Sequence, residues 1–342
     1  MGVTLGITAA EFAVMLGLLL GLIAPLMVWV ERRMCAMIQD RPGPNRLGPF
    51  GLFQPLADVF KFFFKEDLTP AAVDRPLYLM APALALLPAL TTFVVIPFGP
   101  PTEFAGRAVD FTVAGTEAGV LLFLALASLG VYSLVVAGYA SNNKFSLLGG
   151  IRASAQLISY ELALTLTVLA AVLPVGSFNL QEVVAWQREH VWMVVPQALG
   201  FLVFLVAAFA ETNRLPFDLP EAESELVAGF HTEYSAFRFA AFFSAEYVNM
   251  ATLSALAATL YFGGWSIPFV DPPATWWLAA LYGVTGLFAK VAVFLLFFVW
   301  VRWSFPRFRY DQLMRLGWKV LLPLALVNLV AVAAATLAGW LG

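Results

Sequence analysis

The chain has 342 residues, of which 61% are hydrophobic and 12% are charged, and its formal net charge is −3. An average soluble domain has about 25% charged and about 45–50% apolar residues, so a water-soluble fold of this size could not bury so much apolar surface. The composition therefore indicates an integral membrane protein in contact with lipid, and it gives no basic surface for nucleic acid.

Few side chains of the chain can bind a redox metal. There is one cysteine, Cys35, and there are two histidines, His190 and His231. A structural zinc site or an iron–sulfur cluster usually takes four such ligands. We therefore expect no metal, flavin or iron–sulfur cluster in this chain, and electrons for any redox reaction must come from another chain.

Eight apolar segments are long enough to cross a bilayer, which takes about 20 residues of helix. They lie at about 9–30, 77–98, 116–139, 153–174, 192–210, 237–262, 276–301 and 319–340. The first is followed by Glu31-Arg32-Arg33 and not by a small-residue cleavage site, so we interpret it as a retained helix. The sequence predicts an all-α fold with a single polytopic membrane domain over residues 1–342.

The basic residues are distributed unequally between the two sides of this arrangement. Nearly all lysines and arginines lie in the loops after the first, third, fifth and seventh segments, whereas Arg107 and Arg188 lie in the other loops and Lys290 lies within a segment. Because basic loops stay inside, we expect these four loops on the inner face and both termini on the outer, periplasmic side. We expect the protein in a bacterial inner (plasma) membrane and regard a mitochondrial inner membrane as the alternative.

The first inner loop contains a predicted amphipathic helix at residues 53–65. Gln54, Asp58, Lys61 and Lys65 share one face of that helix, and phenylalanines dominate the other face. Such a helix lies in the membrane interface. It is either an anchor or the border of an entrance for an amphiphile whose isoprenoid tail meets the aromatic face.

The third inner loop, residues 211–235, is rich in acids. Pro216 and Pro220 exclude one continuous helix, and apolar residues between the acids favour a packed segment over a solvated loop. Like charges held close together bind protons more readily than isolated ones. The acidic residues of this stretch are Glu211, Asp218, Glu221, Glu223, Glu225 and Glu233.

Further ionisable residues fall within the apolar segments. Glu117 begins the third, Glu161 lies in the fourth, Glu246 in the sixth and Lys290 in the seventh. A charge at the bilayer centre costs at least about 2.5–3.5 kcal/mol, so such residues are functional candidates. The alternative is structural pairing, for example of Glu246 with Lys290, and this is left open for Glu117 and Lys290.

Several long motifs carry a resemblance to one family. They include Glu31-Arg32-Arg33, the turn 40–46 that leads into Phe53–Lys65, residues 141–145, residues 152–161, residues 211–234, Ala245-Glu246-Tyr247 and residues 302–311. The chain resembles the H subunit of bacterial NADH-quinone oxidoreductase (complex I), the counterpart of mitochondrial NADH dehydrogenase subunit 1. The matching stretches run from the first segment to the start of the eighth.

The resemblance implies a subunit of a proton-translocating NADH:quinone oxidoreductase that has no redox centre of its own. The substrate is a quinone, ubiquinone or menaquinone, reduced by the terminal iron–sulfur cluster of a peripheral-arm subunit. Neighbouring small and antiporter-like membrane subunits are the other implied partners. The residues implied to shape the quinone chamber are Glu31, Arg32, Arg41, Arg46, Asp58, Lys61 and Phe217. Those implied to form the proton path are Glu117, Glu161, Glu211, Glu221, Glu223, Glu225, Glu233 and Glu246.

Three other functions are open from the sequence. Homologous membrane subunits serve hydrogenases and other ferredoxin- or formate-linked complexes. A secondary transporter would have its broken helices at mid-membrane, whereas the proline-rich break here lies in a loop. A membrane scaffold would need none of the carboxylates for turnover.

Overall fold

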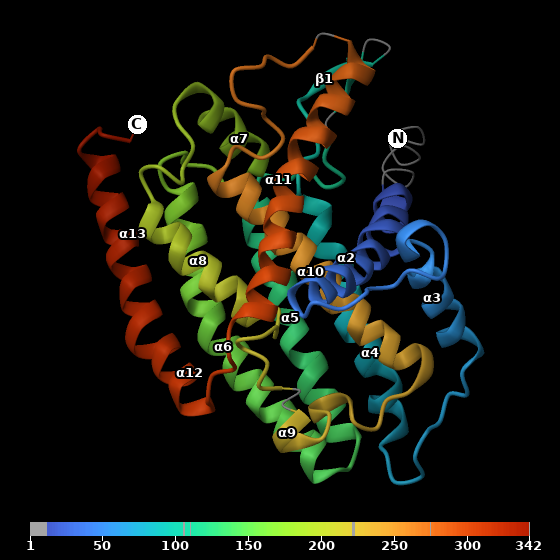
Figure 1. Cartoon of the computed structure of the whole chain (residues 1–342). Coiled ribbons are helices and arrows are strands. Elements are labelled where there is room, and N and C mark those ends of the chain that lie inside the picture. Colours follow the sequence, from blue (N-terminus) through green and yellow to red (C-terminus); the bar gives the residue numbers. More distant parts are fainter. Residues whose placement is uncertain (1–11, 105–106, 110, 221–222, 274, 342) are drawn as a thin grey trace.

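The computed structural model describes residues 12–104, 107–109, 111–220, 223–273 and 275–341. Within these residues the chain is almost entirely helical, as predicted (Figure 1). Each of the eight predicted apolar segments overlaps a helix. These helices are α2 (Ala24–Ile38), α4 (Arg75–Thr92), α5 (Gly119–Ala140), α6 (Lys144–Val172), α8 (Ala198–Glu211), α10 (Ala236–Tyr261), α11 (Trp276–Ser304) and α13 (Leu322–Leu337).

Six helices in the described part of the chain are long and apolar enough to cross a membrane. The first runs from Phe12 to Ile38 through a π-helical turn, Leu19–Ile23, into α2. The last begins as α12 (Tyr310–Leu316) and continues through a second π-helical turn, Gly317–Leu321, into α13. The helix α8 has 14 residues, and α10 has 26 residues with an unusually high share of buried ones.

The helix α10 forms the centre of the bundle. It packs against α4 on one side and α11 on the other, while α4, α5, α6 and α8 follow one another around it. The helix α13 lies outside α6 and α8 (Figure 1). Every residue from Met250 to Tyr261 is buried, which fits a helix that is apolar all round.

Glycine permits a close approach of α5 and α6. A Cβ atom on Gly138 would lie 2.6 Å from the carbonyl oxygen of Ser146, and one on Gly150 would lie 2.8 Å from that of Leu134. Small residues are the usual means by which membrane helices approach this closely.

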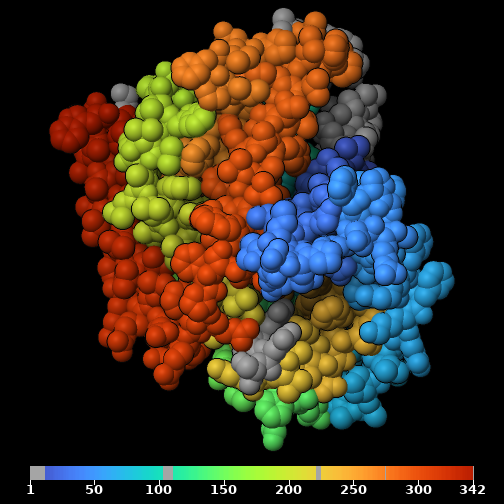
Figure 2. Space-filling model, viewed as in Figure 1, coloured from blue at the N-terminus to red at the C-terminus, as the bar shows by residue number. Residues whose placement is uncertain are grey.

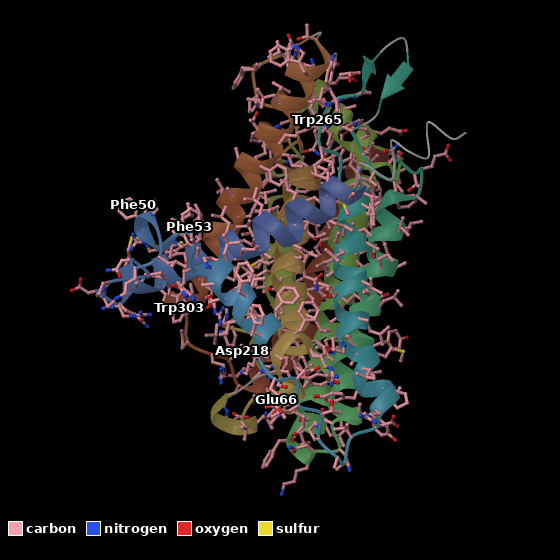
Figure 3. All side chains as sticks on the ribbon, turned by 90° about the vertical axis from the view of Figure 1, so that its right-hand side faces the viewer. Phe50, Phe53, Glu66, Asp218, Trp265 and Trp303 are labelled. Atoms are coloured by element: carbon pink, nitrogen blue, oxygen red, sulfur yellow. The ribbon has the colours of Figure 1, made fainter. Side chains whose placement is uncertain are left out.

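The amphipathic helix of the first inner loop is confirmed as α3 (Gln54–Phe64). Before it, the chain turns through Gly48, Phe50 and Gly51, all with positive φ. The helix packs against both α2 and α10. Figure 3 shows α2 running obliquely across the upright helices, with the turn that holds Phe50 and Phe53 projecting from the side of the bundle.

Three short elements were not predicted from the sequence. A two-stranded antiparallel hairpin, β1 (Thr102–Phe104) and β2 (Arg107–Val109), joins α4 to α5. The short helices α7 (Leu180–Glu189) and α9 (Glu223–Leu226) lie at opposite ends of the bundle (Figure 1). The end of α13 lies at the same end as α7, and the acidic segment lies at the end marked by α9.

Candidate functional site

A cavity of about 540 Å³ lies between the first helix, α3 and α10. Its wall is mainly aliphatic and aromatic, with Leu20 and Val28 on the first helix and Phe239 and Phe243 on α10. Figure 2 shows the blue segment of α2 and the turn after it lying directly above the yellow segment that leads into α10. A volume of this kind suits a largely apolar small molecule.

Three of the polar residues that line this cavity were predicted from the sequence. Arg32, Asp58 and Lys61 all line it. A guanidinium nitrogen of Arg32 lies 2.7 Å from Asp58, and the Lys61 ammonium lies 3.8 Å from the same carboxylate. Asp58 therefore ties α3 to α2 while both cations stay at the cavity.

Glu31 turns away from the cavity into a buried cluster of charges. It is 7% exposed and accepts a hydrogen bond of 2.6 Å from the hydroxyl of Tyr247. It also forms ion pairs with Arg302, in the last turn of α11, and with Arg214. Because a buried carboxylate is costly without partners, these three contacts explain how Glu31 is accommodated.

Arg214 joins two acids that lie on different helices. It is 5% exposed, and its guanidinium lies 3.6 Å from Glu31 and 3.3 Å from Glu246. The guanidinium also lies over the ring of Tyr247, 4.4 Å from the centroid. Asn213, at a φ of 51°, turns the chain after the end of α8 and so directs Arg214 inward.

A second, small cavity of about 50 Å³ lies beside this cluster. Glu211, Asn213, Glu246 and Asn249 give it a polar lining, and apolar residues of α4, α5 and α6 complete the wall. The space is sufficient for a few water molecules. Since Tyr247 lines the large cavity and Glu246 lines the small one, the buried charges connect the two.

Two further predicted acids lie near the small cavity. Glu211 ends α8, and one of its carboxylate oxygens is buried with no hydrogen-bond partner among the described residues. Glu161, in the middle of α6, is close enough to Glu211 for an electrostatic interaction. The structure thus brings Glu211 and Glu246 together at the small cavity, and Glu161 follows one turn after Leu157, the residue of α6 that lines it.

The acidic segment is packed against the bundle, as predicted, for the residues that are described. Phe217, Leu219 and Phe230 are buried, and Asp218 forms an ion pair of 2.8 Å with Arg307. Burial also raises the pKa of Tyr234, whose ring stacks on that of Tyr78.

The other acids of this segment have separate environments. Glu225 is exposed and pairs with Arg152 at 2.6 Å, and Glu233 accepts a hydrogen bond of 2.7 Å from Asn143. Glu221 and the side chain of Glu223 lie outside the described residues.

Four predicted residues lie away from both cavities. Glu117 is exposed in the turn before α5 and not within the helix, about 15 Å along the axis from Ala127, the first residue of α5 that lines the small cavity. Arg41 and Arg46 are exposed in the turn before α3, where Arg41 donates hydrogen bonds to Gln39 and Cys35. Phe217 packs edge-on against Tyr160 and does not line the large cavity.

The structural alternative for these residues, a pair of Glu246 with Lys290, does not form. The Lys290 ammonium donates to the backbone carbonyls of Phe262, Gly264 and Ser266, at 2.7, 2.7 and 2.5 Å. Glu246 instead pairs with Arg214. The sequence left the partner of Glu246 open, because helix order alone does not give the height of a side chain within the bundle.

Sequence reasoning did not select three residues of the buried cluster, Arg214, Tyr247 and Arg302. Two had a recognisable signal, because Arg214 is the one arginine of the acidic segment and Tyr247 directly follows Glu246. Among the described residues, no group of three or more His, Cys, Asp or Glu side chains is arranged to hold a metal ion.

Comparison with known proteins identifies the family of the chain. A family model described as NADH dehydrogenase matches residues 10–333. A Geobacter metallireducens protein named as an H subunit of NADH-quinone oxidoreductase is 52% identical over 90% of both chains. The H subunit of Protochlamydia amoebophila is 50% identical over 92% of this chain and 93% of its own, and that of Methylococcus capsulatus is 49% identical over 96% and 98%. This chain belongs to the NADH dehydrogenase family, among relatives named as the H subunit of NADH-quinone oxidoreductase.

Proposed function

We propose that this chain is the quinone-binding membrane subunit of a proton-translocating NADH:quinone oxidoreductase in a bacterial plasma membrane. The large cavity supports this proposal because its aromatic wall suits an isoprenoid tail. Arg32, Asp58 and Lys61 provide polar partners for a quinone on its way to the head-group site. The relatives' names supply the class of complex.

The observation that carries the coupling part of the proposal is the bridge made by Arg214. This one guanidinium lies within 4 Å of a carboxylate on the quinone side, Glu31, and of a carboxylate on the small-cavity side, Glu246. Negative charge that develops on the reduced quinone draws cations toward it. When Arg214 moves toward that side, Glu246 loses part of its stabilisation and takes up a proton.

The small cavity gives this proton a route. A carboxylate oxygen of Glu211 that has no donor in the described part of the chain, beside a polar cavity of this size, is suited to an internal water molecule. Water there would connect Glu246 with Glu211, and Glu161 would come next. The acids of the 211–235 segment would supply protons from the inner face.

Electrons come from partners in this proposal, namely the peripheral-arm subunit that carries the terminal iron–sulfur cluster. The projecting turn between α2 and α3, with its exposed Arg41 and Arg46, is the surface that we assign to the peripheral arm. The proton transfers in this chain would be linked to proton movement through the neighbouring small and antiporter-like membrane subunits.

The proposed topology has all eight helices crossing the membrane and both termini outside. In this topology α10 crosses at the centre of the bundle, where it is buried from Met250 to Tyr261, and the short α8 crosses at its edge, where Leu199 and Leu202 are exposed. Reporter fusions after Lys144 and at the C-terminus test this topology. If a reporter that works only in the cytoplasm were active when fused to the C-terminus, this topology would be contradicted.

Arg214 offers the sharpest test of the function. In the purified complex, Arg214→Met should abolish proton pumping and most quinone reductase activity, while Arg214→Lys should keep part of both. Arg188→Met is the matched control, because it removes an exposed pair with Asp271 at the other end of the bundle. An assembled Arg214→Met complex that pumps and turns over normally would refute the proposal.

A further inference from the structure

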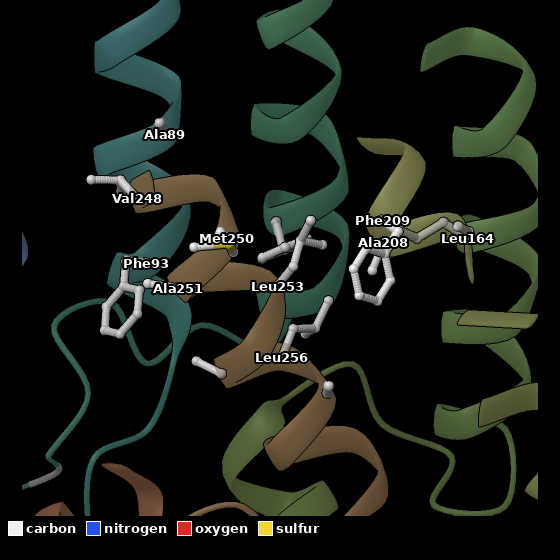
Figure 4. Close-up of a cluster of buried hydrophobic side chains, with 14 of the residues drawn as sticks. Ala89, Phe93, Leu164, Ala208, Phe209, Val248, Met250, Ala251, Leu253 and Leu256 are labelled. Carbon is white, nitrogen blue, oxygen red and sulfur yellow. The ribbon is translucent and has the colours of Figure 1, made fainter. Parts of the chain in front are cut away.

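Beyond Glu246, α10 continues through a tightly buried part of the molecule. Figure 4 shows Met250, Leu253 and Leu256 of this helix surrounded by apolar side chains that include Phe93 and Phe209. At 1.5 Å per residue, the distance along the axis from Glu246 to Phe262 is about 24 Å. A layer of this thickness separates the acids from the opposite end of the bundle.

The hydroxyl groups within this layer are already committed to the backbone. Thr252, Ser254 and Thr259 each donate to the carbonyl four residues earlier, at 2.8, 2.7 and 2.7 Å. A proton relay requires each hydroxyl to donate its hydrogen to the next group of the relay. A hydroxyl whose one hydrogen is held by its own helix cannot pass a proton onward.

The layer ends at a cap that contains a lysine side chain. The cap is formed by Gln187 of α7, Trp192, the turn 262–266 and Lys290 of α11. The three ammonium hydrogens of Lys290 are directed to the three carbonyls of this turn, and its nitrogen lies 5.2 Å from the centroid of the Trp192 ring. An ammonium so bound has no lone pair with which to accept a proton.

Gln187 completes the same cap. Its amide nitrogen donates to the carbonyl of Thr259 at 2.9 Å, and its oxygen accepts from the backbone of Gly263 at 3.0 Å and of Met193 at 3.2 Å. The side chain is buried, so its amide binds backbone and not solvent. Figure 3 shows Trp265, in the turn, near the end of the bundle opposite Asp218.

We infer that the part of the bundle between Glu246 and the Lys290 cap is a proton barrier. The apolar layer along Met250–Tyr261 excludes a hydrated path, and the Lys290 ammonium in the cap repels any proton that approaches. Protons taken up at Glu211 and Glu246 are thereby kept from leaving through the outer end of this chain. The direction of proton movement rests on the proposed function, whereas the barrier itself does not.

The first test measures passive proton leak. Purified complex is placed in liposomes without NADH or quinone, a potassium diffusion potential is imposed, and an internal pH dye is followed. Lys290→Met should raise the leak several-fold and Lys290→Arg should not, while the exposed Lys319→Met serves as the control. An assembled Lys290→Met complex as tight as the wild type would overturn the inference.

The second test uses a different feature, so it decides the matter even if Lys290→Met fails to assemble. The triple variant Thr252→Val, Ser254→Ala and Thr259→Val removes the three serine and threonine hydroxyls that α10 contributes to the layer. We expect an unchanged ratio of protons pumped to electrons transferred. Loss of pumping with quinone reductase activity retained would show that the layer conducts protons. The leak assay needs no turnover, so it also separates failure of the barrier from failure of the proposed function.

Discussion

Tyr247 donates a hydrogen bond of 2.6 Å to Glu31, across the contact between α10 and α2. The same tyrosine lines the large cavity, and the guanidinium of Arg214 lies over its ring. A molecule in the cavity therefore touches a side chain that is bonded directly to the buried charges. Tyr247 thereby connects the proposed quinone site with the proposed proton path.

Removing the hydroxyl of Tyr247 should weaken that connection without emptying the cavity. Tyr247→Phe leaves Glu31 with Arg302 and Arg214, so the complex should assemble. A hydrogen bond to a charged group contributes about 1.5–3 kcal/mol. We expect a several-fold loss of quinone reductase activity, measured with purified complex. Tyr261→Phe, in the opposite half of α10, is the control. Equal activity of the two variants would contradict the assignment.

The attachment of α3 to α2 should matter for quinone access. Asp58→Asn removes the charge that holds Arg32 and Lys61, and a partly exposed pair of this kind contributes up to about 1 kcal/mol. We expect a higher KM for quinone with little change in kcat. Asp311→Asn removes an exposed pair with Arg309 and should leave KM unchanged. A normal KM for Asp58→Asn would exclude a role of this pair at the entrance.

Glu246 should be required for coupling quinone reduction to proton pumping, and much less for folding of the chain. Glu246→Gln leaves Arg214 its contact with Glu31 but removes the charge and the proton site on the small-cavity side. We expect proton pumping to fall more than tenfold, measured by dye quenching in liposomes, with assembly retained. Glu189→Gln alters an exposed acid at the other end of the bundle and should have no effect. Full pumping by Glu246→Gln would remove Glu246 from the path.

The close approach of α5 and α6 should make one glycine irreplaceable. Gly138→Ala puts a methyl group 2.6 Å from a backbone oxygen, and overpacking of this kind costs about 1–3 kcal/mol. Gly130→Ala, on the same helix, meets nothing within 4 Å. Thermal unfolding of the purified complex should show lower stability for Gly138→Ala alone. Equal melting temperatures would show that the two helices separate freely.

Local pattern was sufficient for the helices and for the amphipathic α3, because apolar length and helical periodicity are properties of a contiguous stretch. It also indicated that the acidic segment packs, since apolar residues alternate with the acids there. The hairpin β1–β2 and the short α7 were not predicted, because they are short and depend on the helices that they join. The environment of Glu117 was also misjudged, since helix α5 begins two residues after it.

The sequence by itself determined that this chain is a membrane protein, which segments are helical and which acids and bases lie among them. It also carried the motifs of the family, because those are written in order along the chain. Only the tertiary structure decided the pairing: Arg214 with Glu31 and Glu246, and Lys290 with backbone carbonyls. The physical reason is that a buried charge takes whatever partner the packing of distant helices brings to its own depth, and helix order along the chain does not specify that depth.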